Sequence, residues 1–198
     1  MNTEKGLERG VLYIVATPIG NNDDISSRAR EILIACDRVA TEDTRRAARL
    51  LAELGGNRHK LISLHEHNED KLVGYLVGEL VKGASVALVS DAGTPLLSDP
   101  GYRLVKAASS SGVSVRPIPG PSSIIAALSV CPLPAHPFCF VGFLPKKKKE
   151  LHSRLHGLIK KTEAVVFFES PRRIRRTLSL LSTLTERKIF LIKEMTKT

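Results

Sequence analysis

The sequence predicts two α/β domains, the first with a parallel sheet over residues 1–118 and the second over residues 119–198. The chain has 198 residues, enough to bury the cores of two small domains. Apolar runs of strand length alternate with amphipathic stretches of helix length, which is the order of parallel βαβ units. This series closes near a turn-forming stretch at 117–120, where a second series begins.

The first domain is expected to contain five strands and four helices. The strands are predicted near 11–16, 37–41, 60–64, 85–89 and 113–118, because each is a short apolar run. Helices are predicted between them near 25–35, 44–54, 69–81 and 99–110. Ser98 and Asp99 are preferred helix caps and Pro100 suits a first helical position, so the last of these helices should begin at 99.

The second domain repeats the alternation but looks incomplete. The pattern of apolar runs and turn residues predicts a helix near 121–129, a proline-rich link at 131–137, a strand near 138–143, a helix near 147–160, a strand near 164–168, a helix near 171–183 and a strand near 188–193. Few residues follow that last strand. We therefore expect a C-terminally truncated second domain.

The charge is divided unevenly along the chain and favours a polyanionic partner. Residues 1–100 carry 12 Lys and Arg against 15 Asp and Glu, whereas residues 101–198 carry 18 against 5. Such asymmetry is typical of nucleic-acid binding by the basic half. A general solubility charge is the alternative.

Composition predicts a cytoplasmic protein that neither enters nor crosses a membrane. No apolar run approaches the roughly 18 residues of a membrane span, and the polar start lacks the apolar core of a signal peptide. The three cysteines, Cys36, Cys131 and Cys139, have no metal-ligand spacing and read as reduced thiols.

The unusual loops all follow predicted strands. They span 17–23, 42–45, 65–68, 90–101, 119–122 and 169–171. Because the carboxyl ends of parallel strands share an edge, we expect these loops to converge on one cleft between the two domains. The sequence has neither the Gly-x-Gly-x-x-Gly nor the Gly-x-x-x-x-Gly-Lys-Ser/Thr phosphate loop, which favours a cofactor with little or no phosphate.

Taken together, these loops resemble those of the ribosomal RNA small subunit methyltransferase I family, within the tetrapyrrole (corrin/porphyrin) methylase superfamily. The resemblance runs in order through residues 12–21, 42–45, 65–68, 90–101, 119–122, 142–145 and 169–171. It departs from the family pattern at Asn22, where Leu is common, and at Arg172, where His is common.

This resemblance implies S-adenosylmethionine-dependent 2′-O-methylation of a cytidine ribose in the decoding region of 16S small-subunit ribosomal RNA. It also implies a homodimer whose cofactor lies in the cleft between two α/β domains. The positions that it assigns to the cofactor are Pro18, Ser90, Asp91, Ala92, Gly93, Thr94, Ser122 and Ser123.

The chemistry of methyl transfer asks for positioning and a proton acceptor, and no metal. Asp91 could bind the hydroxyls or ammonium of the cofactor, or instead cap amides of its own loop. Proton acceptors could come from Glu42, Asp43, His65, Glu66 and His67. Of these we single out Asp43 and His67, although Asp43 or Thr44 could simply cap the next helix. Strand alternation would send His65 and His67 to one face, but a metal pair there lacks a third ligand.

Basic residues are the expected contacts to RNA phosphates. They are Arg45, Lys146, Lys147, Arg172, Arg173 and Arg176. A solvated helix face is the alternative for the arginines. Two other functions stay open, a methylase of corrin or porphyrin precursors and a non-catalytic RNA-binding module.

Overall fold

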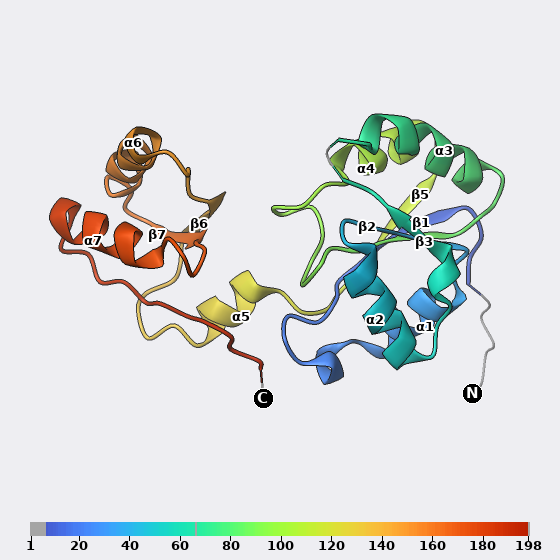
Figure 1. Cartoon of the computed structure of the whole chain (residues 1–198), viewed down its shortest axis with the longest axis horizontal. Coiled ribbons are helices and arrows are strands. Elements are labelled where there is room, and N and C mark those ends of the chain that lie inside the picture. The colour runs from blue at the N-terminus through green and yellow to red at the C-terminus, as the bar shows by residue number, and fades with distance from the viewer. Residues whose placement is uncertain (1–6, 66, 198) are drawn as a thin grey trace. The chain divides into compact units, whose positions relative to one another are not determined.

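The computed structural model describes residues 7–65 and 67–197 and divides into two compact units (Figure 1). The first unit is Met1–Ser123 with Thr196–Thr198, and the second is Ile124–Met195. Glu66, one of the proton acceptors considered from the sequence, lies outside the described residues. No helix in the described ranges is long and apolar enough to cross a membrane.

A parallel sheet of five strands forms the first unit, as the sequence predicts. The strands are β1 (Val11–Val15), β2 (Arg38–Thr41), β3 (Leu61–Ser63), β4 (Val86–Leu88) and β5 (Ser114–Ile118), in the spatial order β3-β2-β4-β1-β5. The predicted helices are also present as α1 (Ser27–Ala35), α2 (Thr44–Leu54), α3 (Glu69–Val81) and α4 (Tyr102–Ser110), with short 3₁₀ helices η1 (Asn22–Asp24) and η2 (Arg58–Lys60).

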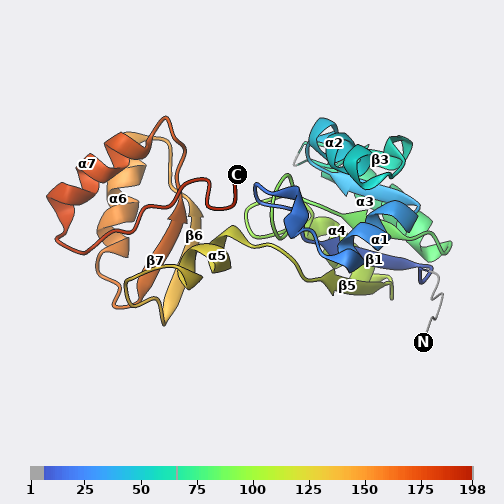
Figure 2. The same cartoon turned by 90° about the horizontal axis from the view of Figure 1, so that it is seen from below.

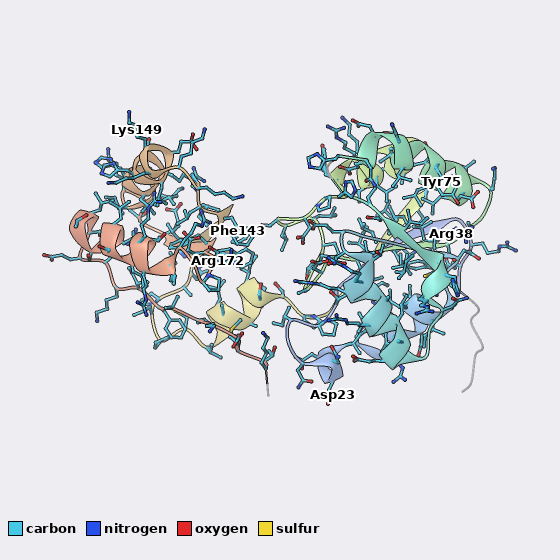
Figure 3. The ribbon with its side chains drawn as sticks, in the orientation of Figure 1. Asp23, Arg38, Tyr75, Phe143, Lys149 and Arg172 are labelled. Atoms are coloured by element: carbon cyan, nitrogen blue, oxygen red, sulfur yellow. The ribbon has the colours of Figure 1, made fainter. Side chains whose placement is uncertain are left out.

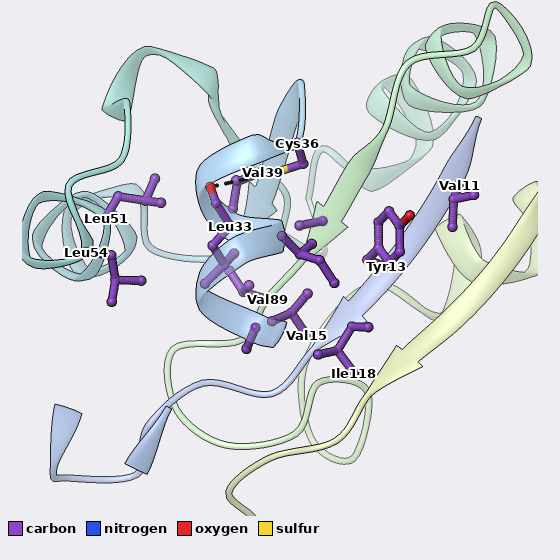
Figure 4. Packing of buried hydrophobic residues seen from close by; sticks show 13 residues of the cluster. Val11, Tyr13, Val15, Leu33, Cys36, Val39, Leu51, Leu54, Val89 and Ile118 are labelled. Atoms are coloured by element: carbon purple, nitrogen blue, oxygen red, sulfur yellow. Dashed lines mark hydrogen bonds between the residues drawn. The ribbon is translucent and has the colours of Figure 1, made fainter. Parts of the chain in front are cut away.

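Helices cover both faces of this sheet, because successive side chains of a strand point to opposite sides. Val11, Tyr13 and Val15 of β1 pack in one cluster with α1 and α2, which Figure 4 shows from close by. Leu12 of β1 packs on the other side with α3 and α4. Figure 1 shows the two helix pairs on opposite sides of the strands.

The strand order creates a switch point between β1 and β4. These two strands are paired in parallel, with Leu12 opposite Val86 and Ile14 opposite Leu88. The chain leaves β1 for β2 over one face and leaves β4 for β5 over the other. Ligands of open parallel sheets bind at the carboxyl ends of such neighbouring strands.

The second unit is smaller and has its own core. Its elements are α5 (Ser123–Ser129), β6 (Phe138–Phe143), α6 (Lys148–Leu158), β7 (Ala164–Phe168) and α7 (Ile174–Leu184). Over the described residues β6 and β7 make a two-stranded parallel sheet. Figure 2 shows α6 and α7 beside it, and leucines of both helices bury against Leu144 at the end of β6.

The predicted strand at 188–193 is wrong. Those residues, all within the described part of the chain, form no strand, and Ile189, Phe190 and Leu191 are 40–57% exposed. A strand exists only where its backbone pairs with a neighbour, and this segment pairs with neither β6 nor β7.

Two predicted helix starts are also wrong. The fourth helix begins at Tyr102 and not at 99, because Glu69 of α3 supplies its cap: one carboxylate oxygen accepts from the amides of Gly101 and Arg103, each at 3.2 Å. The last helix begins at Ile174 and not at 171, with Arg173 as the residue that precedes it.

Candidate active site

The loops that follow β1 and β4 are bonded to each other at the switch point. Thr17 and Gly93 exchange two backbone hydrogen bonds, each N–H donating to the other's carbonyl at 3.0 Å. The buried hydroxyl of Thr17 also donates to the carbonyl of Ser90 at 3.2 Å. These bonds hold Pro18 beside the loop of Ser90, Asp91, Ala92, Gly93 and Thr94, as the sequence leads us to expect of neighbouring strand ends.

The loop after β5 lies at the same edge of the sheet and is hydrogen-bonded to the loop after β4. The hydroxyl of Thr94 donates to the carbonyl of Pro121 at 3.1 Å, and Ser122 and Ser123 follow Pro121 directly in the chain. Gly93 has φ of +83°, and a Cβ there would lie 3.3 Å from Cγ2 of Ile19. At Gly120 a Cβ would lie 3.0 Å from Cβ of Ala16. The three loops therefore form a cradle of small residues, which suits a ligand held by backbone groups.

The side chains of this cradle are largely engaged with protein. The hydroxyl of Ser90 lies 3.2 Å from the carbonyl of Gly93, within its own loop. One oxygen of Asp91 accepts from the amide of Asp43 at 3.3 Å, and the other lies 3.3 Å from a guanidinium nitrogen of Arg46. Asp91 thus fastens the loop after β4 to the start of α2. Sequence reasoning missed Arg46, since nothing in the spacing links it to Asp91.

A second carboxyl group of the same loop, Asp99, was expected only as a helix cap. Burial raises its pKa, and the nearby Asp91 carboxylate raises it further, while a hydrogen bond from Ser90 acts in the opposite direction. Asp99 therefore belongs to the carboxyl edge of the sheet and not to the first turn of α4. The raised pKa of Asp99 depends on the fold of the whole loop, which no local sequence pattern reveals.

An open depression lies beside this cradle at the ends of β2 and β3. Its volume is about 450 Å³ and its lining is Glu42, Asp43, Thr44, Arg45, Ser63, His65 and Asp91. Asp43 caps α2, accepting from the amide of Arg45 at 2.9 Å. Hydrogen bonds from Arg45, which is itself 86% exposed, lower the pKa of Asp43 to about 2. So low a pKa makes Asp43 a weak proton acceptor near neutral pH.

The histidines lie in a loop, since β3 ends at Ser63; the expectation of strand alternation for His65 and His67 is wrong. Asn68 shapes this loop by accepting from the amide of His65 and donating to the carbonyl of Ser63, both at 2.9 Å. The two imidazole rings nevertheless meet edge to face, 5.9 Å apart. Nδ1 of His65 is buried and has no hydrogen-bond partner among the described residues.

The described residues contain no group of three or more His, Cys, Asp or Glu side chains that could hold a metal ion.

In the second unit the expected RNA contacts divide into two kinds. Lys146, Lys147, Arg172 and Arg176 are exposed. Arg173 is engaged with protein: its guanidinium pairs with Glu169 at 2.5 Å and donates to the carbonyls of Leu144 and Pro145 at 3.1 and 3.2 Å. Arg173 thus ties the loop after β7 to the loop after β6. Figure 3 labels Arg172 at this end of the unit.

Glu169 is the centre of that connection. Its side chain is 3% exposed, and besides Arg173 it accepts from the amide of Ser170 and the hydroxyl of Thr177, both at 2.7 Å. The sequence singles out the stretch 169–171 as a binding loop. In the structure, Glu169 of this stretch holds the loop after β7 in place through its contacts with Arg173, Ser170 and Thr177.

Comparisons with known proteins identify the family of the chain. The family model of the tetrapyrrole (corrin/porphyrin) methylases matches residues 11–198. Proteins named ribosomal RNA small subunit methyltransferase I are 47% identical over 190 residues in Xylella fastidiosa and 49% identical over 189 residues in Mesorhizobium japonicum. These alignments cover 95% and 94% of this chain, but 69% and 64% of the relatives. The chain thus spans about two thirds of the length of its curated relatives.

Solved structures share the fold at low sequence identity. A uroporphyrin-III C-methyltransferase from Thermus thermophilus superposes with a TM-score of 0.55 at 21% identity, covering 78% of this chain and 76% of its own. A diphthine synthase superposes with a TM-score of 0.63 at 15% identity, covering 87% and 72%. With the family model matching nearly the whole length, the chain belongs to the tetrapyrrole methylases, among the proteins named ribosomal RNA small subunit methyltransferase I.

Proposed function

We propose that this protein transfers a methyl group from S-adenosylmethionine to the 2′-hydroxyl of a cytidine ribose in the decoding region of 16S ribosomal RNA. The observation that carries this proposal is 47–49% identity, over about 95% of the chain, with proteins named ribosomal RNA small subunit methyltransferase I. The cytidine and its 2′-oxygen come from the resemblance of the loops to that family.

The cradle at the ends of β1, β4 and β5 is the proposed cofactor site. Its small residues and its lack of a phosphate loop suit an adenosyl group held by backbone atoms. Pro18, Ala92, Gly93 and Thr94 would contact it along the two bonded loops, with Ser90, Asp91, Ser122 and Ser123 beside them. When bound, S-adenosylmethionine supplies an electrophilic methyl group, so the chain itself must orient the ligands and exclude water.

The proposed proton acceptor for the ribose hydroxyl is His67, with His65 beside it. Asp43 is the poorer candidate, because its pKa of about 2 leaves it with little affinity for a proton. Histidine is the side chain most often used as a general base, so His67 could take the proton as the oxygen attacks. His65 lines the depression, and the edge contact between the two rings places His67 next to His65.

Exposed cations provide the proposed RNA contacts, namely Arg45 in the first unit and Lys146, Lys147, Arg172 and Arg176 in the second. Phosphate contacts give affinity without reading sequence. A folded small subunit would therefore be a better substrate than a short RNA, because it offers phosphates over a broad surface. We further propose a cytoplasmic homodimer, which a molar-mass measurement in solution checks.

Transfer of a labelled methyl group tests the proposal directly. The purified chain is incubated with methyl-tritiated S-adenosylmethionine and small subunits that lack the modification, and the RNA is digested to nucleosides. We expect label in 2′-O-methylcytidine. Label in a supplied uroporphyrinogen would instead support a tetrapyrrole methylase, and salt-sensitive RNA binding with no transfer would support a non-catalytic module.

A further inference from the structure

We propose that Phe143, at the carboxyl end of β6, is a stacking platform for an unpaired RNA base, with phosphates held by the cations around it. This inference deepens the proposed function, because it takes RNA as the substrate class. The side chain is labelled in Figure 3.

Phe143 is exposed although its strand leads into a hydrophobic core. Its side chain is 60% exposed, more than any of the other five phenylalanines, all of which lie in the described part of the chain. A large aromatic surface left in water loses the free energy that burial would give it. A binding partner that covers the Phe143 ring would recover this free energy.

A bulge in β6 places the Phe143 ring on the face of the sheet that points away from the core. Phe140 is opposite Val166 and Phe143 is opposite Phe168, so three residues of β6 span the distance of two in β7. Gly142 adopts a φ of +68° within this stretch. With regular alternation Phe143 would share the core-facing side of Val141; the extra residue reverses its direction, which is a recognised effect of bulges.

Neighbouring aromatic rings support Phe143 from beneath. The ring of Phe168 lies 5.3 Å from that of Phe143 and 5.0 Å from that of Phe140, tilted or edge-on in both pairs. Phe168 therefore fixes the position of Phe143 while much of the Phe143 ring stays accessible. Rigid aromatic groups bind bases at little entropic cost.

The cations lie at the same edge of the sheet. Lys146 and Lys147 follow β6 and Arg172 follows β7, and both strands end at this edge because they are parallel. Arg173 joins the two loops by donating to the carbonyls of Leu144 and Pro145. These basic residues thus follow the strand ends at the edge of the sheet where Phe143 ends β6.

This combination favours RNA over a protein partner. The buried centre of a protein interface is depleted of charge, whereas proteins that bind single-stranded nucleic acid surround stacking aromatic residues with cations. The strong positive charge of residues 101–198 complements phosphates. Every base has a π face, so a platform of this kind accepts an unpaired nucleotide without reading its identity.

Binding to two probes separates stacking from phosphate contact. The first probe is a fluorescein-labelled unpaired RNA of twelve nucleotides, and the second is a ribose-phosphate chain of the same length that lacks bases. In anisotropy titrations at fixed salt, we expect Phe143→Ala to weaken binding of the first by about 5- to 100-fold and to leave the second unchanged. Phe143→Trp should retain the affinity for both.

Phe138 offers a matched control, since it is 41% exposed on the same strand but lies at its other end, away from these cations. Phe138→Ala should leave both affinities unchanged. Phe143→Leu keeps an apolar side chain without a π face, so it should bind the base-containing probe as weakly as Phe143→Ala even if the alanine variant is less stable. Unchanged affinity in both Phe143 variants, or an equal loss for both probes, would overturn the inference.

These titrations contain no cofactor and thus stand apart from the transfer assay. If methyl transfer is observed but RNA binding does not depend on Phe143, only the proposed stacking platform is contradicted. Binding that depends on Phe143 without any transfer sinks only the proposed reaction.

Discussion

In each unit the loops at the carboxyl edge of the sheet are joined to one another, but the two units use different kinds of contact. In the first unit, backbone bonds and small residues link the loops after β1, β4 and β5, as in the paired amides and carbonyls of Thr17 and Gly93. In the second unit, the loops after β6 and β7 are joined by the buried ion pair of Glu169 and Arg173. Backbone linkage lets a ligand approach the main chain at the first edge, whereas side chains make the connection at the second edge and the other cations there are exposed.

The contrast extends to the charged side chains at the two edges. The first edge has partly buried carboxyl groups, where the Asp91 carboxylate raises the pKa of Asp99 and pairs with Arg46. Cations gather at the second, after both strands. A single chain thus separates the region that suits a small cationic ligand from the region that suits a polyanion.

The largest effect should follow from breaking the ion pair of the second unit. Glu169→Ala leaves the guanidinium of Arg173 partly buried without its carboxylate, which costs about 3–5 kcal/mol for buried pairs. Urea unfolding followed by hydrogen exchange should find the loss concentrated in residues 124–195. Glu163→Ala removes a more solvent-accessible ion pair, that with Lys161, and should cost far less. Equal losses in the two variants would contradict the central role of Glu169.

Charge reversal at Arg172 and Arg176 should reduce RNA affinity next most strongly. For each phosphate that the variant no longer neutralises, the slope of log Kobs against log salt becomes shallower by about 0.7 for single strands. Titrations of RNA at several salt concentrations measure this slope, and cofactor affinity should stay unchanged. The double reversal of Arg28 and Arg30 to Glu, at two exposed positions of α1, is the control for total charge. An unaltered slope in the double variant would remove both arginines from the RNA surface.

A methyl group at Gly93 should disturb the first edge by a smaller amount. Gly93→Ala places a side chain at a φ of +83°, a conformation that costs an ordinary residue about 1–2 kcal/mol, and brings it against Ile19. Gly55 has a φ of +79° with nothing within 4 Å of a built Cβ, so Gly55→Ala pays the backbone cost alone. Calorimetric titration with S-adenosylmethionine should show weaker binding only for Gly93→Ala. The same affinity in both variants would place the cofactor elsewhere.

The smallest effect concerns the charge of Asp99. Its pKa is raised in the folded protein, so the stability it gives is present at low pH and is lost as the pH rises through the folded pKa. Asp99→Asn, which cannot ionise, should therefore have a higher Tm than the parent protein at pH 7, and the difference should vanish near pH 3. Thermal melts across this range measure it. A variant that melts below the parent protein at pH 7 would contradict this, because it would show that the carboxylate is stabilised by its partners.

Sequence patterns anticipate the first unit well because its strands and helices are encoded locally. Each of the five strands is a short apolar run, and their number and parallel order follow from the alternation with helices. Asp43 as the cap of α2 could likewise be read from its neighbours. What could not be read depends on contacts between distant segments: the pairing of Asp91 with Arg46, the raised pKa of Asp99, and the burial of Arg173 among carbonyls.

The failed predictions have the same origin. Residues 98–100 carry good helix-starting residues, yet the helix starts only at Tyr102 because Glu69 binds the amides of Gly101 and Arg103. Residues 188–193 have a strand-like composition, but composition supplies no neighbouring strand to pair with. Local propensity predicts what a segment prefers, and tertiary partners decide what it adopts.

The buried carboxylate of Glu69 also restricts how the loop before α4 can move. The loop is anchored at its beginning by Gly93 and at its far end by Glu69, a residue that no ligand need touch. Fewer conformations are then available before a ligand arrives, so less entropy is surrendered on association. Glu69 in this way influences ligand affinity through the freedom of the loop, from its position at the start of α3.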